Sequence, residues 1–303
     1  AIGNRPIDLH IAGMESLGAE IIIEDGFIKA SRKGRLRGAT IILPFPSVGA
    51  TENIIMAATL AEGTTRIKNC ALEPEIIDLI KCLNAWGANI SGAGTSSIVV
   101  QGVKKMDGGF FRVMSDRIET ATYLAAAAAT GGKIRTMRAD PSNISAVLEK
   151  FRKTGGDLTF GVDWIELDMR GKRPKAVNIT TGPYPCFPTD MQAQFTVVNS
   201  LAIGIAQVTE TIFENRLAQV QELRCMGAKI ALNNNVAVIT GVPKLTGTHV
   251  MASDLRASAA LVIAGVAAEG ETTIDEIHHV DRGYECFEEK LHQLGAKITR
   301  LPS

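Results

Sequence analysis

The sequence of 303 residues lacks a surplus of charge of either sign, a long apolar run and a paired-cysteine motif. Its 32 acidic residues balance 32 basic ones, which argues against a general nucleic-acid or acidic-membrane surface, because both need clustered positive charge. No apolar run approaches the ~20 residues of a membrane span, and no secretory signal is visible, so we expect a soluble protein of about two domains. The five scattered cysteines favour reduced thiols in a cytosolic protein over disulfides or zinc.

What the sequence does contain is a repeat of about 70 residues. Its marker is a small-residue turn followed by the start of a strand. The central glycines of the five markers are Gly18, Gly87, Gly155, Gly227 and Gly295, at intervals of 69, 68, 72 and 68 residues. A unit of this length predicts a repeated α/β supersecondary block.

One unit, residues 38–103, indicates the order β-α-β-α-β-β. A β-rich segment at 39–43 precedes a small, apolar helix at 50–61, a strand at 64–68, an amphipathic helix at 76–86 and two short strands near 90 and 98–100. The other copies fit this template. We expect a strand and an alanine-rich helix within 112–130, a second helix capped by Ser142, and similar pairs within 177–232 and 250–298.

The first helix of each unit has almost no polar face. Residues 121–129, 193–205 and 257–268 are small or apolar nearly all round, so these helices must be buried on every side. We therefore expect them to pack at the centre of each domain with sheets around them. An ordinary alternating α/β fold, with helices outside a central sheet, is disfavoured because it would expose them to water.

Polar residues concentrate where the buried helices begin, at 47–51, 115–117, 188–190 and 253–256. Ser, Thr and Asp at these places are typical helix caps. The arginines need another reason. Helix N-termini attract anions, and arginine adds bidentate contacts to phosphate or carboxylate, so converging helix starts would hold a multiply charged small anion.

Several segments closely resemble UDP-N-acetylglucosamine 1-carboxyvinyltransferase, also called UDP-GlcNAc enolpyruvyl transferase. They are residues 5–10, 45–53, 73–75, 187–194, 213–216, 254–257 and 281–285. The resemblance spans the chain and implies the enolpyruvyl transferase fold, a two-domain inside-out α/β barrel of repeated βαβαββ units with the active site between the domains. It implies a first domain at 1–114, lacking its N-terminal portion, and a second domain at 115–303.

The resemblance also implies chemistry in a segment before Ala1. In the family, a loop there carries the cysteine or aspartate that protonates phosphoenolpyruvate and is the target of fosfomycin, and a Lys-Asn pair contacts both substrates. We therefore expect this chain to be a fragment, or one of two pieces, of a longer protein. A separate N-terminal piece is an expected partner.

The family reaction joins the sugar 3′-hydroxyl to C2 of phosphoenolpyruvate and then expels phosphate, which requires an acid, a base and an anion clamp. By resemblance, Asp190 is the proposed base, although it could instead be an N-cap. Arg216, Arg256 and Arg282 match arginines that bind phosphate or carboxylate, and Arg282 is also assigned to catalysis. The expected nucleotide-sugar contacts are Arg5, Pro6, Ile7, Asp8, Leu9, Phe45, Pro46, Ser47, Val48 and Ile212.

Some assignments stay open at this stage. Phe45 stands where some family members carry lysine, and Glu73 and Asp254 are equally well explained by function or by structure. His278 and His279 are expected to point apart on a strand without an acidic partner, so no metal and no cofactor are expected.

Two rival functions remain beside the bacterial, cytoplasmic enzyme of peptidoglycan synthesis that the resemblance implies. One is a 3-phosphoshikimate carboxyvinyltransferase-like enzyme, which shares the fold and reaction, although residues 5–10 and 187–194 favour the UDP-sugar enzyme. The other is an inactive fragment that binds nucleotide sugar.

Overall fold

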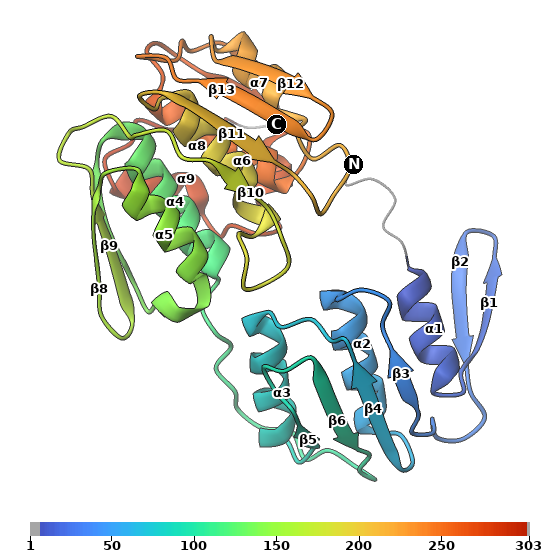
Figure 1. The fold of residues 1–303 in the computed structure, drawn as a ribbon. Coiled ribbons are helices and arrows are strands. Elements are labelled where there is room, and N and C mark those ends of the chain that lie inside the picture. Colours follow the sequence, from blue (N-terminus) through green and yellow to red (C-terminus); the bar gives the residue numbers. More distant parts are fainter. Residues whose placement is uncertain (1–6, 302–303) are drawn as a thin grey trace. The chain divides into compact units, whose positions relative to one another are not determined.

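The computed structural model of the protein describes residues 7–301, which fall into two compact units with their boundary in the sequence between Met114 and Ser115 (Figure 1). Arg5 and Pro6 lie outside the described residues. The assignment of these units as the two domains of a longer enzyme, the first one incomplete, stays a prediction.

The N-terminal unit contains one whole repeat and part of another. The partial repeat is α1 (Asp8–Ser16) followed by the antiparallel hairpin of β1 (Glu20–Glu24) and β2 (Phe27–Ser31). The whole repeat is β3 (Thr40–Ile42), α2 (Val48–Thr59), β4 (Thr64–Lys68), α3 (Pro74–Ala85), β5 (Asn89–Ser91) and β6 (Ser97–Gln101). Its sheet has the order β3-β4-β6-β5, in which only β3 and β4 are parallel. The predicted β-α-β-α-β-β order is confirmed.

The C-terminal unit contains three further copies of the pattern. The first is α4 (Arg117–Thr130), β7 (Lys133–Met137), the 3-10 helix η1 (Pro141–Ile144), α5 (Ser145–Lys153), β8 (Asp157–Phe160) and β9 (Trp164–Asp168). The second is β10 (Ile179–Thr180), η2 (Thr189–Met191), α6 (Gln192–Ser200), β11 (Ile205–Thr209), α7 (Gln219–Cys225), β12 (Lys229–Asn233) and β13 (Val236–Thr240). The third is β14 (His249–Met251), α8 (Leu255–Ala267), β15 (Thr273–Asp275), η3 (Ile277–Val280) and α9 (Phe287–Gln293).

Only the second of these copies builds the complete four-stranded sheet. Its order, β10-β11-β13-β12, repeats that of the N-terminal unit strand for strand. The first copy forms the three-stranded sheet β7-β9-β8, and in the third the described residues form only the parallel pair β14-β15.

The helices α4, α6 and α8 pack against one another at the centre of the C-terminal unit, as their composition predicts (Figure 1). Every residue of α6 is buried. Buried polar groups need hydrogen-bond partners, and most of those of α6 find them: Gln192 donates to Thr196, and the Asn199 side chain both donates to and accepts from the backbone of Val177, whereas Gln194 Oε1 accepts no hydrogen bond from the described residues.

The five marker glycines share one backbone conformation. Their φ angles lie between 87° and 99°, a region that residues with a Cβ rarely adopt. Each of them directly follows the C-cap residue of a helix; in chain order these helices are α1, α3, α5, α7 and α9. Glycine is common just after helices for this reason. The repeat visible in the sequence therefore reflects one turn that recurs after the second helix of each unit.

Two arginines join their repeats in the same way. Arg35 donates hydrogen bonds to the backbone carbonyls of Leu60, Ala61 and Val103. Arg173 donates to the equivalent carbonyls of the second C-terminal copy, Leu201, Ala202 and Val242. One guanidinium thus satisfies carbonyls at the end of a buried helix and beyond the last strand of the same unit, a geometry that suits its planar fork of donors.

Three local expectations are corrected. Residues 112–116 form no strand; Met114 instead donates its N–H to Asp78 in the connection out of the first unit. Asp140, not Ser142, caps the turn before α5, accepting a hydrogen bond from the Ser142 backbone. His278 and His279 lie on the 3-10 helix η3 rather than on a strand, because the chain turns immediately after β15.

All five cysteines are free thiols. Among the described residues, no helix combines the length and the apolar character that crossing a membrane requires.

Candidate functional site

An aspartate held between two arginines is the centre of the candidate site in the C-terminal unit. Arg216 Nη2 donates to Asp190 Oδ1 at 2.6 Å, and Arg256 Nη2 donates to Asp190 Oδ2 at 3.0 Å. The arginine side chains are only 20% and 14% exposed, whereas that of Asp190 is 36% exposed. The cluster is therefore partly desolvated, and Asp190 is the most exposed of its three side chains.

The charges of this cluster are mutually dependent. Burial by itself raises the pKa of Asp190, but the charges of Arg256 and Arg216 and their hydrogen bonds outweigh it and hold the pKa below the ordinary value. Burial lowers the pKa of Arg256, and the Asp190 charge more than reverses this. At neutral pH the carboxylate is ionised and both of its oxygens are occupied by guanidinium groups.

Two helix starts bring these side chains together. Asp190 lies on η2, directly before the buried helix α6, and Arg256 lies in the first turn of α8. Asp254 caps α8 by accepting hydrogen bonds from the backbone N–H groups of Arg256 and Ala257, so its structural role is established by contact. Because α6 and α8 pack side by side, their N-terminal residues converge.

Arg216 comes from the loop between β11 and α7, and a buried glutamate holds this loop. Glu210 is 2% exposed and accepts hydrogen bonds from the hydroxyls of Thr181 and Thr189 and from the backbone N–H groups of Ile212 and Phe213. Thr189 in turn accepts from Arg216 Nη1 at 3.2 Å. Glu210 thus fixes both the turn that carries Asp190 and the loop that carries Arg216.

A second set of buried polar contacts supports Arg256. Its Nη1 donates to the Tyr284 hydroxyl at 3.2 Å, and that hydroxyl is 2.9 Å from Thr122 Oγ1, which also accepts from Gln194. Tyr284 is 2% exposed, and burial raises its pKa, so its hydroxyl stays protonated. Sequence reasoning missed Tyr284 and Glu210 as site residues. The signal that could have identified Tyr284 is its place in the segment 281–285, which resembles the family. Glu210 lies in none of the resembling segments.

The structure brings together some of the predicted residues and not others. Ile212 follows Glu210 on the loop that carries Arg216, with its side chain 37% exposed. Arg282 is exposed on the turn between η3 and α9, whereas the arginines that donate to Asp190 are Arg216 and Arg256. The roles assigned to Ile212 and Arg282 stay predictions.

The remaining candidates lie in the N-terminal unit. Ile7 and Asp8 are exposed at the start of α1, which continues through the half-buried Leu9. Phe45, 51% exposed, and Pro46 precede Ser47, whose hydroxyl caps α2 at Val48 by accepting from the Ala50 N–H at 3.4 Å.

Glu73 lies directly before α3 and makes no capping hydrogen bond. Burial raises the pKa of the neighbouring Glu52, and the charges of Glu75 and Glu73 raise it further. Glu73 therefore belongs to a group of three carboxylates, an electrostatic role that the sequence did not indicate.

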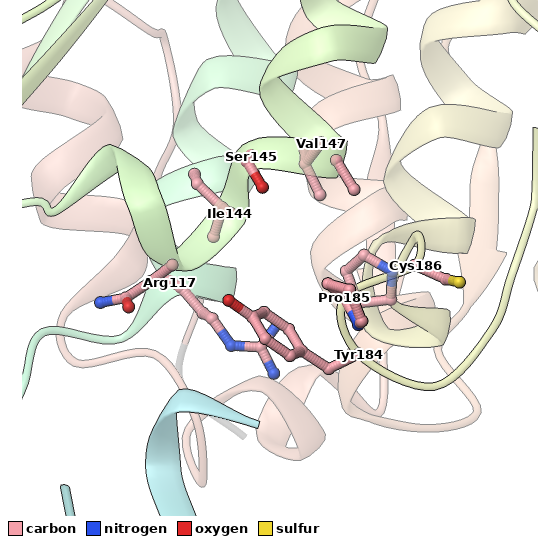
Figure 2. A pocket seen from close by; sticks show the side chains of 10 residues that line it. Arg117, Ile144, Ser145, Val147, Tyr184, Pro185 and Cys186 are labelled. Carbon is pink, nitrogen blue, oxygen red and sulfur yellow. The ribbon is translucent and has the colours of Figure 1, made fainter. Parts of the chain in front are cut away.

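A small pocket is lined by the start of α4, the start of α5 and the segment before η2 (Figure 2). Pro188, two residues before Asp190, lines it together with Ile144, Ser145 and Cys186. Figure 2 shows the Arg117 side chain lying against the ring of Tyr184, with the guanidinium carbon 5.8 Å from the ring centroid. The start of α4, which the sequence singled out as a possible anion-binding end, thus faces this pocket with its arginine.

Comparison with solved structures defines the class of protein first. The enolpyruvyl transferase NikO from Streptomyces tendae superimposes with a TM-score of 0.87 at 24% identity, over 97% of this chain and 72% of NikO. EPSP synthase from Acinetobacter baumannii gives a TM-score of 0.73 at 20% identity, over 97% of this chain and 72% of that one. A second structure of that enzyme gives 0.71 at 20% identity, over 99% and 73%. The predicted enolpyruvyl transferase fold is therefore confirmed.

The family follows from the sequence itself. Residues 1–291 match the model of the family described as EPSP synthase (3-phosphoshikimate 1-carboxyvinyltransferase). The chain belongs to this family and is a transferase of the enolpyruvyl (carboxyvinyl) class.

Proposed function

We propose that this chain is the larger part of an enzyme that transfers the enolpyruvyl group of phosphoenolpyruvate to the 3′-hydroxyl of UDP-N-acetylglucosamine, with release of phosphate. The observation that carries the proposal is the convergence of Arg216 and Arg256 on Asp190. All three lie in segments that resemble the UDP-sugar enzyme. Two guanidiniums beside a carboxylate offer an anion clamp and a base in one place.

The reaction proceeds by addition and elimination. The sugar oxygen bonds to C2 of phosphoenolpyruvate while its proton leaves and C3 gains a proton. The tetrahedral intermediate then loses phosphate by cleavage of the C2–O bond and a proton from C3, which restores the double bond. In this scheme Asp190 accepts the hydroxyl proton, and Arg216, Arg256 and Arg282 bind the phosphate and carboxylate groups.

The salt bridges of Asp190 suggest how its basicity is controlled. Without ligand, both oxygens are bound by arginines and the pKa is lowered, so Asp190 is a weak base. A bound phosphate or carboxylate would compete for the same guanidiniums and weaken their hold on Asp190. Its pKa would then rise toward the ordinary value, and it would become a better base only when phosphoenolpyruvate is present.

The open sheets support a further segment as partner. The order of both complete sheets places the second strand of the unit beside the fourth. Among residues 7–301, the pair β14-β15 lacks the third and fourth strands of this pattern, and the pair β1-β2 lacks the first and second. Ile28 of β2 is 45% exposed, whereas Ile98 and Ala237 at the corresponding places are fully buried. We propose that strands of an N-terminal piece complete these sheets, since open edges are avoided in stable folds.

The physiological setting follows from the same resemblance. The enzyme would act in the bacterial cytoplasm at the first committed step of peptidoglycan synthesis. Its fosfomycin sensitivity would depend on the loop residue of the N-terminal piece.

A second candidate is transfer to shikimate 3-phosphate, favoured by the description of the matched family and by the fold of the Acinetobacter baumannii enzyme. It uses the same anion clamp but another acceptor hydroxyl. Phosphate release from phosphoenolpyruvate, measured separately with UDP-N-acetylglucosamine and with shikimate 3-phosphate, separates the two.

The assay should use protein purified from its source, with its intact mass measured under denaturing conditions. A second piece or a longer chain, with release that depends on UDP-N-acetylglucosamine, supports the proposal. Release that depends only on shikimate 3-phosphate replaces it with the second candidate. A lone 32.3 kDa chain that binds UDP-N-acetylglucosamine without phosphate release identifies an inactive fragment.

Asp190→Asn in the same active preparation tests the proposed base. We expect turnover to fall by about 100-fold or more, because general bases contribute at least this much. Near-normal turnover with unchanged substrate binding would remove Asp190 from the mechanism.

A further inference from the structure

Three metal-binding side chains converge where β15 passes into η3. Glu276, directly after β15, has a φ of 54°, a left-handed conformation that is uncommon for a residue with a Cβ. The chain then enters η3 with His278 and His279. The turn and the tight helix together direct all three side chains to one place, which a straight strand would not do.

The distances between the donor atoms are short. His278 Nδ1 is 3.4 Å from Glu276 Oε2, and the two imidazole centroids are 4.3 Å apart with planes inclined by 39°. One ligand atom from each of the three residues lies within 4.8 Å of the others. The expectation that the histidines point apart, without an acidic partner, is therefore wrong.

We propose that Glu276, His278 and His279 form a binding site for a transition-metal ion of the Zn²⁺ class, with solvent completing the coordination. Ligands about 2.1 Å from a tetrahedral zinc ion lie about 3.4 Å apart, which is the spacing of the Glu276 and His278 donors. The donor atoms lie within 4.8 Å of one another, so His279 needs to approach by at most about 1.4 Å, a movement within reach of side-chain rotation on a solvent-facing helix. Such a site is independent of the proposed transfer reaction.

The donor set selects the class of metal. Two imidazole nitrogens and one carboxylate suit Zn²⁺, Ni²⁺ or Cu²⁺, whereas Mg²⁺ and Ca²⁺ prefer oxygen ligands. The nearby carboxylates are engaged elsewhere. Asp275 Oδ2 accepts a hydrogen bond from His249 Nε2 at 2.7 Å, and Asp281 accepts two hydrogen bonds from Arg300. Among the described residues, the site therefore has three protein ligands, one carboxylate and two imidazoles.

Calorimetric titration of the 303-residue chain with ZnCl₂ tests the site. The chain should first be freed of metal and its cysteines alkylated, because Cys186, Cys225 and Cys286 are exposed thiols that could bind zinc. We expect one saturable equivalent of Zn²⁺ that excess Mg²⁺ does not displace. Circular dichroism before and after alkylation controls for unfolding.

Matched substitutions locate the binding. His278→Ala and His279→Ala should each weaken zinc binding at least about tenfold, as loss of a group that orients or binds a metal commonly does. Glu276→Gln should weaken it as well. His292→Ala, which removes an exposed histidine of α9 outside the cluster, should leave binding unchanged. Absence of saturable binding by the unsubstituted chain, or undiminished binding by both His278→Ala and His279→Ala, overturns the proposal.

Discussion

Replacement of Glu210 tests whether one buried carboxylate organises the candidate site. Its carboxylate accepts four hydrogen bonds, two from threonine hydroxyls and two from backbone N–H groups, at distances between 2.7 and 3.2 Å. In Glu210→Ala all four donors lose their acceptor. The Thr181 side is buried, so its donor would stay unsatisfied, whereas water can reach the exposed loop at Ile212.

The magnitude follows from this difference. An unsatisfied buried donor costs about 1–3 kcal/mol, and each exposed hydrogen bond contributes about 1 kcal/mol or less. Removal of the buried charge recovers part of that cost. We therefore expect Glu210→Ala to lower the free energy of unfolding by about 3 kcal/mol. Glu210→Gln should cost about 1.5 kcal/mol, because the amide keeps one acceptor oxygen but presents a donor to the Thr189 hydroxyl.

Urea unfolding followed by circular dichroism measures these differences. Glu214→Ala is the matched control, since it removes an exposed glutamate from the same loop and should change stability by no more than about 0.5 kcal/mol. If Glu210→Ala is no more destabilised than Glu214→Ala, the loop does not depend on the buried carboxylate and the reasoning is refuted.

Three further predictions follow from the C-terminal unit. Because the pKa of Asp190 is lower in the folded protein than its unfolded value of about 3.9, its ionisation stabilises the fold above that pH, and this stability is lost as the pH falls through the folded pKa. The urea midpoints of the wild type and Asp190→Asn should therefore converge in acid. A constant difference between the two midpoints would contradict this. Gly227→Ala should cost about 1–2 kcal/mol, seen as a lower Tm, because its φ is 92° although a Cβ would meet no neighbour. Tyr284→Phe removes the hydroxyl that accepts a hydrogen bond from Arg256 and should lower the free energy of unfolding by about 1 kcal/mol. Within the proposed function it should raise the KM for phosphoenolpyruvate more than it lowers kcat. Unchanged kinetics would show that Arg256 does not depend on this hydrogen bond.

Much of the fold could be predicted because its signals are local. The marker turns need glycine at positive φ, so a backbone requirement is written at nearly regular intervals along the chain. The buried helices α4, α6 and α8 were predicted because a helix without a polar face can only be stable away from water. The strand expected before α4, within 112–130, was wrongly predicted, because the repeat alone does not reveal where the chain leaves one unit for the next.

The candidate site was predicted only in part. Resemblance identified Asp190, Arg216 and Arg256, but no local pattern relates residues that are 26 and 66 positions apart. Apart from the place of Tyr284 in a segment that resembles the family, Glu210 and Tyr284 have no local signal in the sequence that marks them as site residues. Their roles come from contacts with other segments: Glu210 accepts hydrogen bonds from two threonine hydroxyls, and Tyr284 accepts one from Arg256. The histidine pair was misjudged because a single left-handed residue, Glu276, changes the direction of the chain.

The sequence by itself therefore determined the repeat, the order of its helices and strands, the class of helix that must be buried and the family resemblance, since each depends on neighbours within a few turns of the chain. Tertiary structure alone decided which charges meet, in which direction a pKa moves and which sheets keep open edges. Those properties depend on distances between segments far apart in sequence, and packing of the repeats against one another sets these distances.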